Sequence, residues 1–353
     1  MNYYKNFIRS TLFQLDAEMA HNLAIFGLKS NVIRYPKIKN YDRLKINICN
    51  IDFDNPISMA AGFDKNGLIV SNLFNFGFGS VECGTVTPKA QIGNPKPRIF
   101  RLKEDGAIIN RLGFNNVGID KFLQNIKSQK INGPFGINIG KNKDQKDSAL
   151  DYIDLMDLVY GLSSYVTINI SSPNTKDLRD IQKKSELDLF LQKIVTKKLE
   201  LAVKIGKNIP IFLKIAPDLN DNELQDISDI VLRNKIDAVI ISNSTISRKN
   251  LKSKNKKEVG GLTGKPLFDM SNEVLSKFYQ LTDGKIPLIA SGGVFSAENA
   301  YEKIKRGASM VQIYSAFIYE GFSLVETIKK DLDILLKKGG FNNISEAVGI
   351  ERG

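Results

Sequence analysis

The stretch SYVTINISSPNT (164–175) decides how the rest of the chain is interpreted. It begins as a largely apolar strand, and Pro173 ends that strand because proline lacks an N–H and restricts the residue before it. A helical stretch over 187–205 follows, and then a second apolar run, PIFLKIAP (210–217). Near-continuous apolar runs separated by helices are typical of parallel strands buried on both faces. The segment therefore predicts a β/α/β unit.

The same unit recurs along the chain, with further helices expected at 221–233, 272–280 and 297–306. Eight such units in order favour closure into a (β/α)₈ TIM barrel, an α/β fold, over the alternative of an open, doubly wound sheet. The expected strands are 56–62, 78–85, 133–140, 164–171, 210–217, 237–244, 287–293 and 309–315.

Two connections are much longer than the others, 86–132 and 245–286. Loops that follow barrel strands lie on the catalytic face of this fold, so both insertions are expected to build the functional site.

Residues 1–40 are expected to form a small helical segment in front of the barrel domain, which spans 41–353. Asp16 can cap a helix that has apolar residues along one face. That face would either pack on the barrel as a lid or form an apolar platform on a membrane surface, and periodicity alone favours the lid. The apolar residues are Met19, Leu23 and Phe26.

Composition excludes several classes of protein. Hydrophobic residues make up 42% of the chain and charged residues 25%, which is ordinary for a globular protein. We expect neither a secretion signal nor a transmembrane span, because no apolar run approaches about 20 residues. Cys49, Cys83 and the single histidine, His21, have no metal-site spacing, so we expect no disulfide framework, no metal and a reducing compartment.

The net charge of +12 allows two interpretations, a nucleic-acid or anionic-membrane partner, or a general excess of lysine. The densest basic run, RKNLKSKNKK (248–257), lacks interleaved aromatic residues. We interpret it as a solvated loop and expect no nucleic-acid partner.

Polar residues gather where the predicted strands end, which is where catalytic groups lie in a TIM barrel. Lys214 is the most informative, because a lysine inside an apolar strand is costly to bury without a partner. It would either form a salt bridge inside the barrel mouth or face negative charge on a cofactor. The glycine pairs at 260–261 and 292–293, and the turn after 315, suggest a phosphate site.

Ten motifs that occur in order between residues 59 and 321 resemble the dihydroorotate dehydrogenase family, flavoproteins that oxidise dihydroorotate to orotate in pyrimidine (UMP) synthesis. They are MAAGFDKNG, ECGTVTP, GNPKPRIFRL, IINRLGFNN, GINIGKNK, TINISSPNT, LKIAPDL, GGLTGKPL, ASGGV and MVQIYSAFIYEG. The LDAEMAH extension, and a serine instead of a cysteine in the catalytic loop, resemble class 2, which is membrane-associated and quinone-dependent.

The resemblance implies one FMN per chain. Its contacts would fall on Ala61, Gly62, Phe63, Asp64, Lys65, Thr85, Asn138, Asn169, Lys214, Ser242, Gly264, Gly293, Tyr314 and Ser315. Dihydroorotate would be bound by Lys65, Asn110, Arg111, Leu112, Gly113, Phe114, Asn169, Asn174, Asn243 and Ser244.

The resemblance also makes Ser172 the catalytic base, whereas by itself Ser172 is an ordinary turn hydroxyl. A serine must be activated before it can act as a base. Two routes stay open for Ser172, hydrogen bonding in a closed site and a relay through water and Thr175. His21, Arg101 and Tyr314 would line a path to ubiquinone or menaquinone, although His21 could equally serve in packing. Class 2 further implies a peripheral location on the cytoplasmic face of a bacterial membrane. The pattern is compatible with a monomer.

Three alternatives stay open at this point. A class 1 enzyme would use fumarate or NAD and a cysteine base, which Ser172 and residues 1–40 disfavour. A tRNA dihydrouridine synthase would need a catalytic cysteine, and Cys83 lies inside a predicted strand. A barrel that binds phosphate without catalysis is the third.

Overall fold

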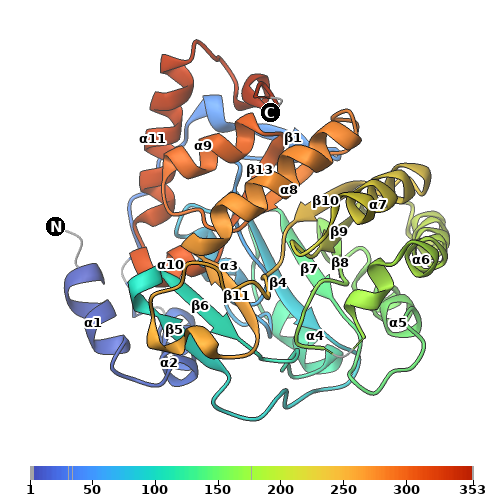
Figure 1. Cartoon of the computed structure of the whole chain (residues 1–353), viewed down its shortest axis with the longest axis horizontal. Helices are drawn as coiled ribbons and strands as arrows, with labels where there is room; N and C mark the ends of the chain where they lie inside the picture. The colour runs from blue at the N-terminus through green and yellow to red at the C-terminus, as the bar shows by residue number, and fades with distance from the viewer. Residues whose placement is uncertain (1–3, 31, 34, 176, 352–353) are drawn as a thin grey trace.

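The computed structural model describes residues 4–30, 32–33, 35–175 and 177–351. Its centre is a closed barrel of eight parallel strands in the order β10-β12-β13-β3-β4-β7-β8-β9 (Figure 1). Each strand overlaps one of the eight predicted stretches, so the TIM barrel is confirmed and the open sheet is not. The barrel strands are β3 (Ile57–Met59), β4 (Ser80–Val86), β7 (Phe135–Ile139), β8 (Tyr165–Asn169), β9 (Ile211–Ile215), β10 (Ala238–Ile241), β12 (Leu288–Ser291) and β13 (Ala308–Ile313).

Helices surround the barrel and cover the outward faces of its strands (Figure 1). The four helices predicted by range are confirmed as α6, α7, α8 and α9, and α7 begins with a capping box in which Asn220 and Glu223 bond to each other's backbone N–H groups. The surrounding helices are α3 (Val70–Phe74), α4 (Ile119–Lys127), α5 (Leu150–Val159), α6 (Lys184–Ile205), α7 (Asp221–Arg233), α8 (Phe268–Leu281), α9 (Ala297–Lys305), α10 (Ser315–Glu320) and α11 (Leu324–Lys338).

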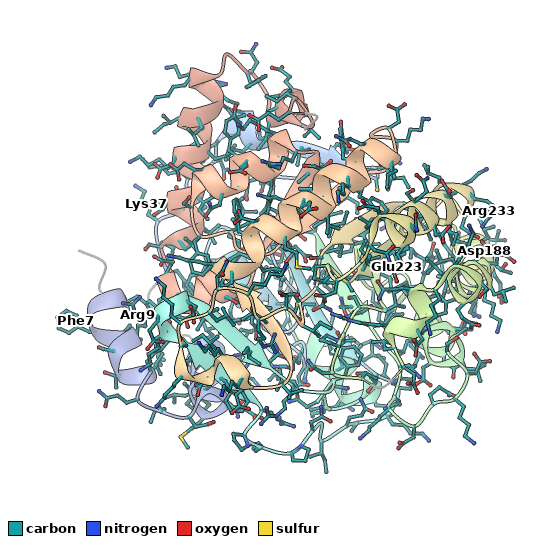
Figure 2. All side chains as sticks on the ribbon, in the orientation of Figure 1. Phe7, Arg9, Lys37, Asp188, Glu223 and Arg233 are labelled. Atoms are coloured by element: carbon teal, nitrogen blue, oxygen red, sulfur yellow. The ribbon has the colours of Figure 1, made fainter. Side chains whose placement is uncertain are left out.

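Side chains on the outer helices reach solvent or pair with one another, as Asp188 and Arg233 do between α6 and α7 at 3.0 Å (Figure 2). The opposite, N-terminal end of the barrel is covered by a hairpin of β1 (Ile46–Ile48) and β2 (Ile51–Phe53). Cys49 in its turn donates a hydrogen bond to the carbonyl of Asp237, the residue before β10. The hairpin thus closes the N-terminal end of the barrel. Any ligand site inside the barrel must therefore open at the C-terminal end.

The two long insertions meet in a small antiparallel sheet beside the barrel mouth. The first supplies β5 (Ile99–Leu102) and β6 (Ala107–Asn110), and the second supplies β11 (Gly261–Gly264), which pairs with β6. Two segments that are far apart in the sequence therefore share one sheet. This sheet lies next to α2 in Figure 1.

The predicted N-terminal helix is α2 (Ala17–Lys29), preceded by the short α1 (Arg9–Leu12). Asp16 caps it as expected, since its carboxylate accepts hydrogen bonds from the N–H groups of residues 18 and 19 at 2.9 and 3.0 Å. The preference for a lid formed by the predicted apolar face is wrong, because that face is exposed. Met19, Leu23 and Phe26 are 58%, 50% and 67% exposed.

The helix instead packs through the opposite stripe, in which Ala20 and Leu28 are buried. Phe7, before α1, also points outward (Figure 2) and is 56% exposed. The extension therefore carries an apolar outer surface as well as an apolar inner one. No helix in the described ranges is long and apolar enough to cross a membrane.

The basic run 248–257 is only partly the solvated loop that the sequence suggested. Its lysines are exposed, but Leu251 and Ser253 are buried, and Arg248 donates hydrogen bonds to the carbonyls of Glu258 and Gly260. Arg248 thus holds the second insertion together, and the backbone N–H groups of residues 252 and 253 join it to the first insertion by donating to the Asp105 carboxylate.

Candidate active site

A largely polar cavity opens at the C-terminal mouth of the barrel, which is where ligands bind in this fold. Most of the predicted site residues line it, although they come from strand ends spread over more than 250 residues of sequence. Those that line it are Ala61, Gly62, Lys65, Thr85, Asn110, Leu112, Gly113, Phe114, Asn169, Ser172, Asn174, Lys214, Ser242, Asn243, Ser244, Gly264, Gly293, Tyr314 and Ser315.

Four of the residues predicted to bind FMN or dihydroorotate do not line this cavity. The Arg111 guanidinium turns away to pair with Glu258 at 2.7 Å. Phe63 faces a second, apolar cavity, and the Asp64 carboxylate accepts the N–H groups of residues 68 and 69. Asn138 lies one layer below, where it supports the lining residues.

A buried carboxylate, Glu82, organises the barrel interior beneath the cavity. It accepts hydrogen bonds from Asn138 at 2.8 Å, from Thr167 at 3.1 Å and from Gln312 at 2.8 Å. Asn138 in turn accepts a hydrogen bond from Asn169, which lines the cavity, at 3.2 Å. The cavity floor is therefore a connected polar network centred on the Glu82 side chain.

Lys214 enters this network from β9 and is 5% exposed. Its ammonium has one hydrogen-bond partner among the described residues, the Gln312 amide oxygen at 3.4 Å. Burial lowers the pKa of Lys214, and the nearby Glu82 carboxylate partly offsets that effect. The salt bridge that was the alternative for Lys214 is absent from the described residues, so its remaining N–H groups face the cavity.

Lys65, at the end of β3, is the second cation of the cavity. Its ammonium makes no ion pair or hydrogen bond within the described part of the chain. Desolvation lowers the pKa of Lys65 to about 8, and Glu18, Arg98 and Asp64 act on it in smaller opposing ways. Two under-paired lysines in one cavity fit an anionic ligand.

The loop after β8 holds Ser172, which is buried and accepts a hydrogen bond from the N–H of Asn174 at 3.3 Å. Arg179 fixes this loop, because it donates to the carbonyls of Ser171 and Ser244 and pairs with Asp218 at 2.8 Å. No histidine or carboxylate contacts the Ser172 hydroxyl among the described residues. The loop is therefore held in place by Arg179, and the Ser172 hydroxyl proton is free to bond into the cavity.

The far end of the cavity presents backbone N–H groups. Gly292 and Gly293 adopt φ of +115° and +73°, which a residue with a side chain rarely adopts, and follow β12. The helix α10 starts at Ser315 beside them, and its N-cap residue makes no side-chain cap. First-turn N–H groups without a cap, next to a glycine turn, suit a phosphate.

A second cavity of about 720 Å³, mainly apolar, lies between the N-terminal extension and the barrel. The three residues predicted for the electron-acceptor path, His21, Arg101 and Tyr314, all line it. Desolvation and Lys65 lower the pKa of His21 to about 3, so the imidazole is neutral. Arg101 donates a hydrogen bond to the carbonyl of Leu15 at 2.8 Å and covers the Phe13 ring at 4.7 Å.

Comparison with known proteins agrees with this geometry. The profile of one family, dihydroorotate dehydrogenase, matches residues 43–336. The chain belongs to the dihydroorotate dehydrogenase family. It is similar to the dihydroorotate dehydrogenase (quinone) of Bartonella tribocorum, with 47% identity over 98% of this chain and 96% of the relative. The corresponding protein of Agrobacterium fabrum is 44% identical over 96% of this chain and 93% of its own length.

Solved structures of the family superpose closely. A DHODH from Eimeria tenella in complex with ferulenol has a TM-score of 0.91 and 37% identity, and covers 95% of both chains. The ligand-free form from the same organism has the same TM-score and 38% identity, over 95% of this chain and 99% of that one.

Sequence reasoning missed several site residues of this dihydroorotate dehydrogenase family member. Glu82 and Gln312 interrupt apolar strands as Lys214 does, so the same signal could have found them. Asn115 lines the polar cavity, and its side-chain oxygen is buried without a hydrogen-bond partner in the described part of the chain. Its place in the motif GFNN was the available signal. The described residues contain no cluster of metal-ligating side chains.

Proposed function

We propose that this chain oxidises (S)-dihydroorotate to orotate with FMN as hydride acceptor and a quinone as final electron acceptor, in the synthesis of UMP. The observation that carries the proposal is that the polar cavity and the apolar cavity share Tyr314. A cofactor seated at that junction can exchange electrons with a polar substrate on one side and an apolar quinone on the other. The family relatives named as quinone enzymes support this proposal.

The residues present fit FMN. The turn at Gly292 and Gly293 and the uncapped start of α10 would hold its phosphate, and the 61–65 and Asn169 region would hold its ring. Lys214 would hold positive charge beside the ring, because it has one weak partner of its own. When bound, the flavin supplies the hydride-accepting centre that no side chain can provide.

Dihydroorotate would lie against the loop that carries Ser172. Asn110 and Asn174, whose side chains are 3.4 Å apart, and Asn243 would bind the flat ring through amide donors and acceptors. Lys65 would pair with the carboxylate. Ser172 would remove the proton from carbon 5 while hydride leaves carbon 6, so that two C–H bonds break and a C=C bond forms.

The apolar cavity would admit ubiquinone or menaquinone past His21 and Arg101. The exposed residues Met19, Leu23 and Phe26 would place residues 1–40 in the surface of a membrane, which supplies the quinone. We accordingly propose a peripheral location on the cytoplasmic face of the membrane.

Anaerobic flavin spectroscopy tests this function. Purified protein should be yellow, bleach when dihydroorotate is added, and recolour with a ubiquinone analogue. Failure to bleach would refute the reaction. Recolouring with fumarate or NAD, but not with quinone, would instead indicate the class 1 acceptor, which the relatives do not favour.

A further inference from the structure

One guanidinium connects the N-terminal extension to the first insertion. Arg98, 5% exposed, donates hydrogen bonds from Nε and Nη2 to the two carboxylate oxygens of Glu18 at 2.9 and 2.6 Å. Its Nη1 donates to the carbonyls of Ile92 and Asn94 at 2.6 and 2.9 Å. Arg98 therefore joins helix α2 to the loop at 92–94, and the bidentate geometry fixes the orientation of both.

The same loop supports the wall of the polar cavity. The backbone N–H of Asn94 donates to the carbonyl of Leu112 at 3.0 Å, and its amide group donates to the carbonyls of Arg111 at 3.0 Å and Asn174 at 3.4 Å. Leu112 and Asn174 line the cavity. An unbroken set of contacts thus runs from α2 through Glu18, Arg98 and Asn94 to the substrate wall.

Helix α2 also faces the apolar cavity and the outer surface. His21 lines that cavity one turn after Glu18, and Met19, the next residue, is exposed. A change in the position of α2 relative to the barrel, caused by a membrane or by a quinone, must therefore move the Glu18 carboxylate that holds Arg98.

We propose that Arg98 is a positioning residue, which couples the position of helix α2 to the geometry of the dihydroorotate site. This inference rests on the proposed function, since it names a support for that site. In this view the N-terminal extension completes the substrate site as well as enclosing the apolar cavity.

The pair has a second effect, through charge. The charged groups that act on Lys65 are Glu18, Arg98 and Asp64. His21 also faces it, and Lys65 helps to lower the pKa of His21. Glu18 raises the pKa of Lys65 and Arg98 lowers it, beneath the larger lowering by desolvation. Loss of one member should therefore shift the pKa of Lys65 in the direction opposite to loss of the other.

The test uses the flavin-loaded full chain and measures the dissociation constant of orotate from the flavin spectrum. Arg98→Lys keeps the charge but cannot contact both Glu18 and the two carbonyls, and Glu18→Gln weakens the same pair from α2. Each should weaken orotate binding by about tenfold and slow anaerobic bleaching, with flavin content unchanged. Lys96→Gln is the matched control, because the exposed Lys96 ammonium lies 3.5 Å from Glu18 and, among the described residues, makes no hydrogen bond to residues 92–94.

The pH dependence of orotate affinity separates the proposed role of the Glu18–Arg98 pair from a general loss of structure. Glu18→Gln should move the high-pH loss of orotate affinity to lower pH, and Arg98→Gln should move it to higher pH. If Arg98→Gln does not fold, Arg98→Lys and Glu18→Gln decide the matter. Wild-type orotate affinity in both would overturn the inference, as would shifts in the same direction, whereas a wild-type protein that dihydroorotate does not bleach would overturn the proposed function itself.

Discussion

We expect Lys65 to make the binding of a carboxylate substrate dependent on pH in a range where most lysines stay charged. Desolvation lowers the pKa of this ammonium to about 8, and no carboxylate of the described chain pairs with it. An anionic ligand needs the protonated form, so affinity should be full below the lowered pKa and should fall as pH rises through it. Between about pH 7 and about pH 9 the protonated fraction falls about tenfold, and the affinity for orotate should fall by the same factor.

The matched variant is Lys65→Arg, whose guanidinium stays charged throughout this range. Orotate binding is measured from the flavin absorbance at constant ionic strength, for both proteins across the same pH series. Titration of the ligand itself and of Lys214 affects both proteins, so the ratio of their affinities isolates Lys65. A wild-type profile that runs parallel to that of Lys65→Arg would refute the assignment of Lys65 to the carboxylate.

Three further predictions concern the two cavities and the exposed face of α2. Ser172→Ala should keep its flavin but slow anaerobic bleaching by dihydroorotate about 10²- to 10⁴-fold, the usual contribution of a general base, and near-normal bleaching would remove Ser172 from that role. Arg101→Gln should slow recolouring by a quinone analogue about tenfold and leave bleaching unchanged; equal effects on both half-reactions would contradict a quinone role. Replacing Met19, Leu23 and Phe26 together by serine should weaken vesicle binding at least about tenfold without changing turnover with a water-soluble quinone, and undiminished binding would exclude this face as the membrane contact.

The barrel could be predicted from the sequence because buried parallel strands leave a strong, local signal. The positions of the strands could be predicted from apolar runs such as 164–171 and 210–217. The polar residues at the ends of these runs indicated the mouth of the barrel. Proximity in the fold then follows from topology, which is why residues as distant as Lys65 and Ser315 could be assigned to one cavity.

Other features depend on contacts that no local pattern encodes. The pairing of β6 with β11 joins two insertions, and the turning of Arg111 toward Glu258 depends on that pairing. Helix α2 has apolar residues on both sides, so its period could not show which side packs. In the structure Ala20 and Leu28 are buried, and Met19, Leu23 and Phe26 stay exposed.

The function proposed for this chain is the transfer of electrons from dihydroorotate to a quinone across two adjoining cavities. A single anaerobic titration tests it, with flavin absorbance and orotate formation followed in the same sample. We predict that each equivalent of dihydroorotate bleaches one flavin and yields one orotate, and that a quinone analogue then restores the colour. Bleaching without formation of orotate would contradict the proposed reaction. Formation of orotate without recolouring by the quinone analogue would contradict quinone as the electron acceptor.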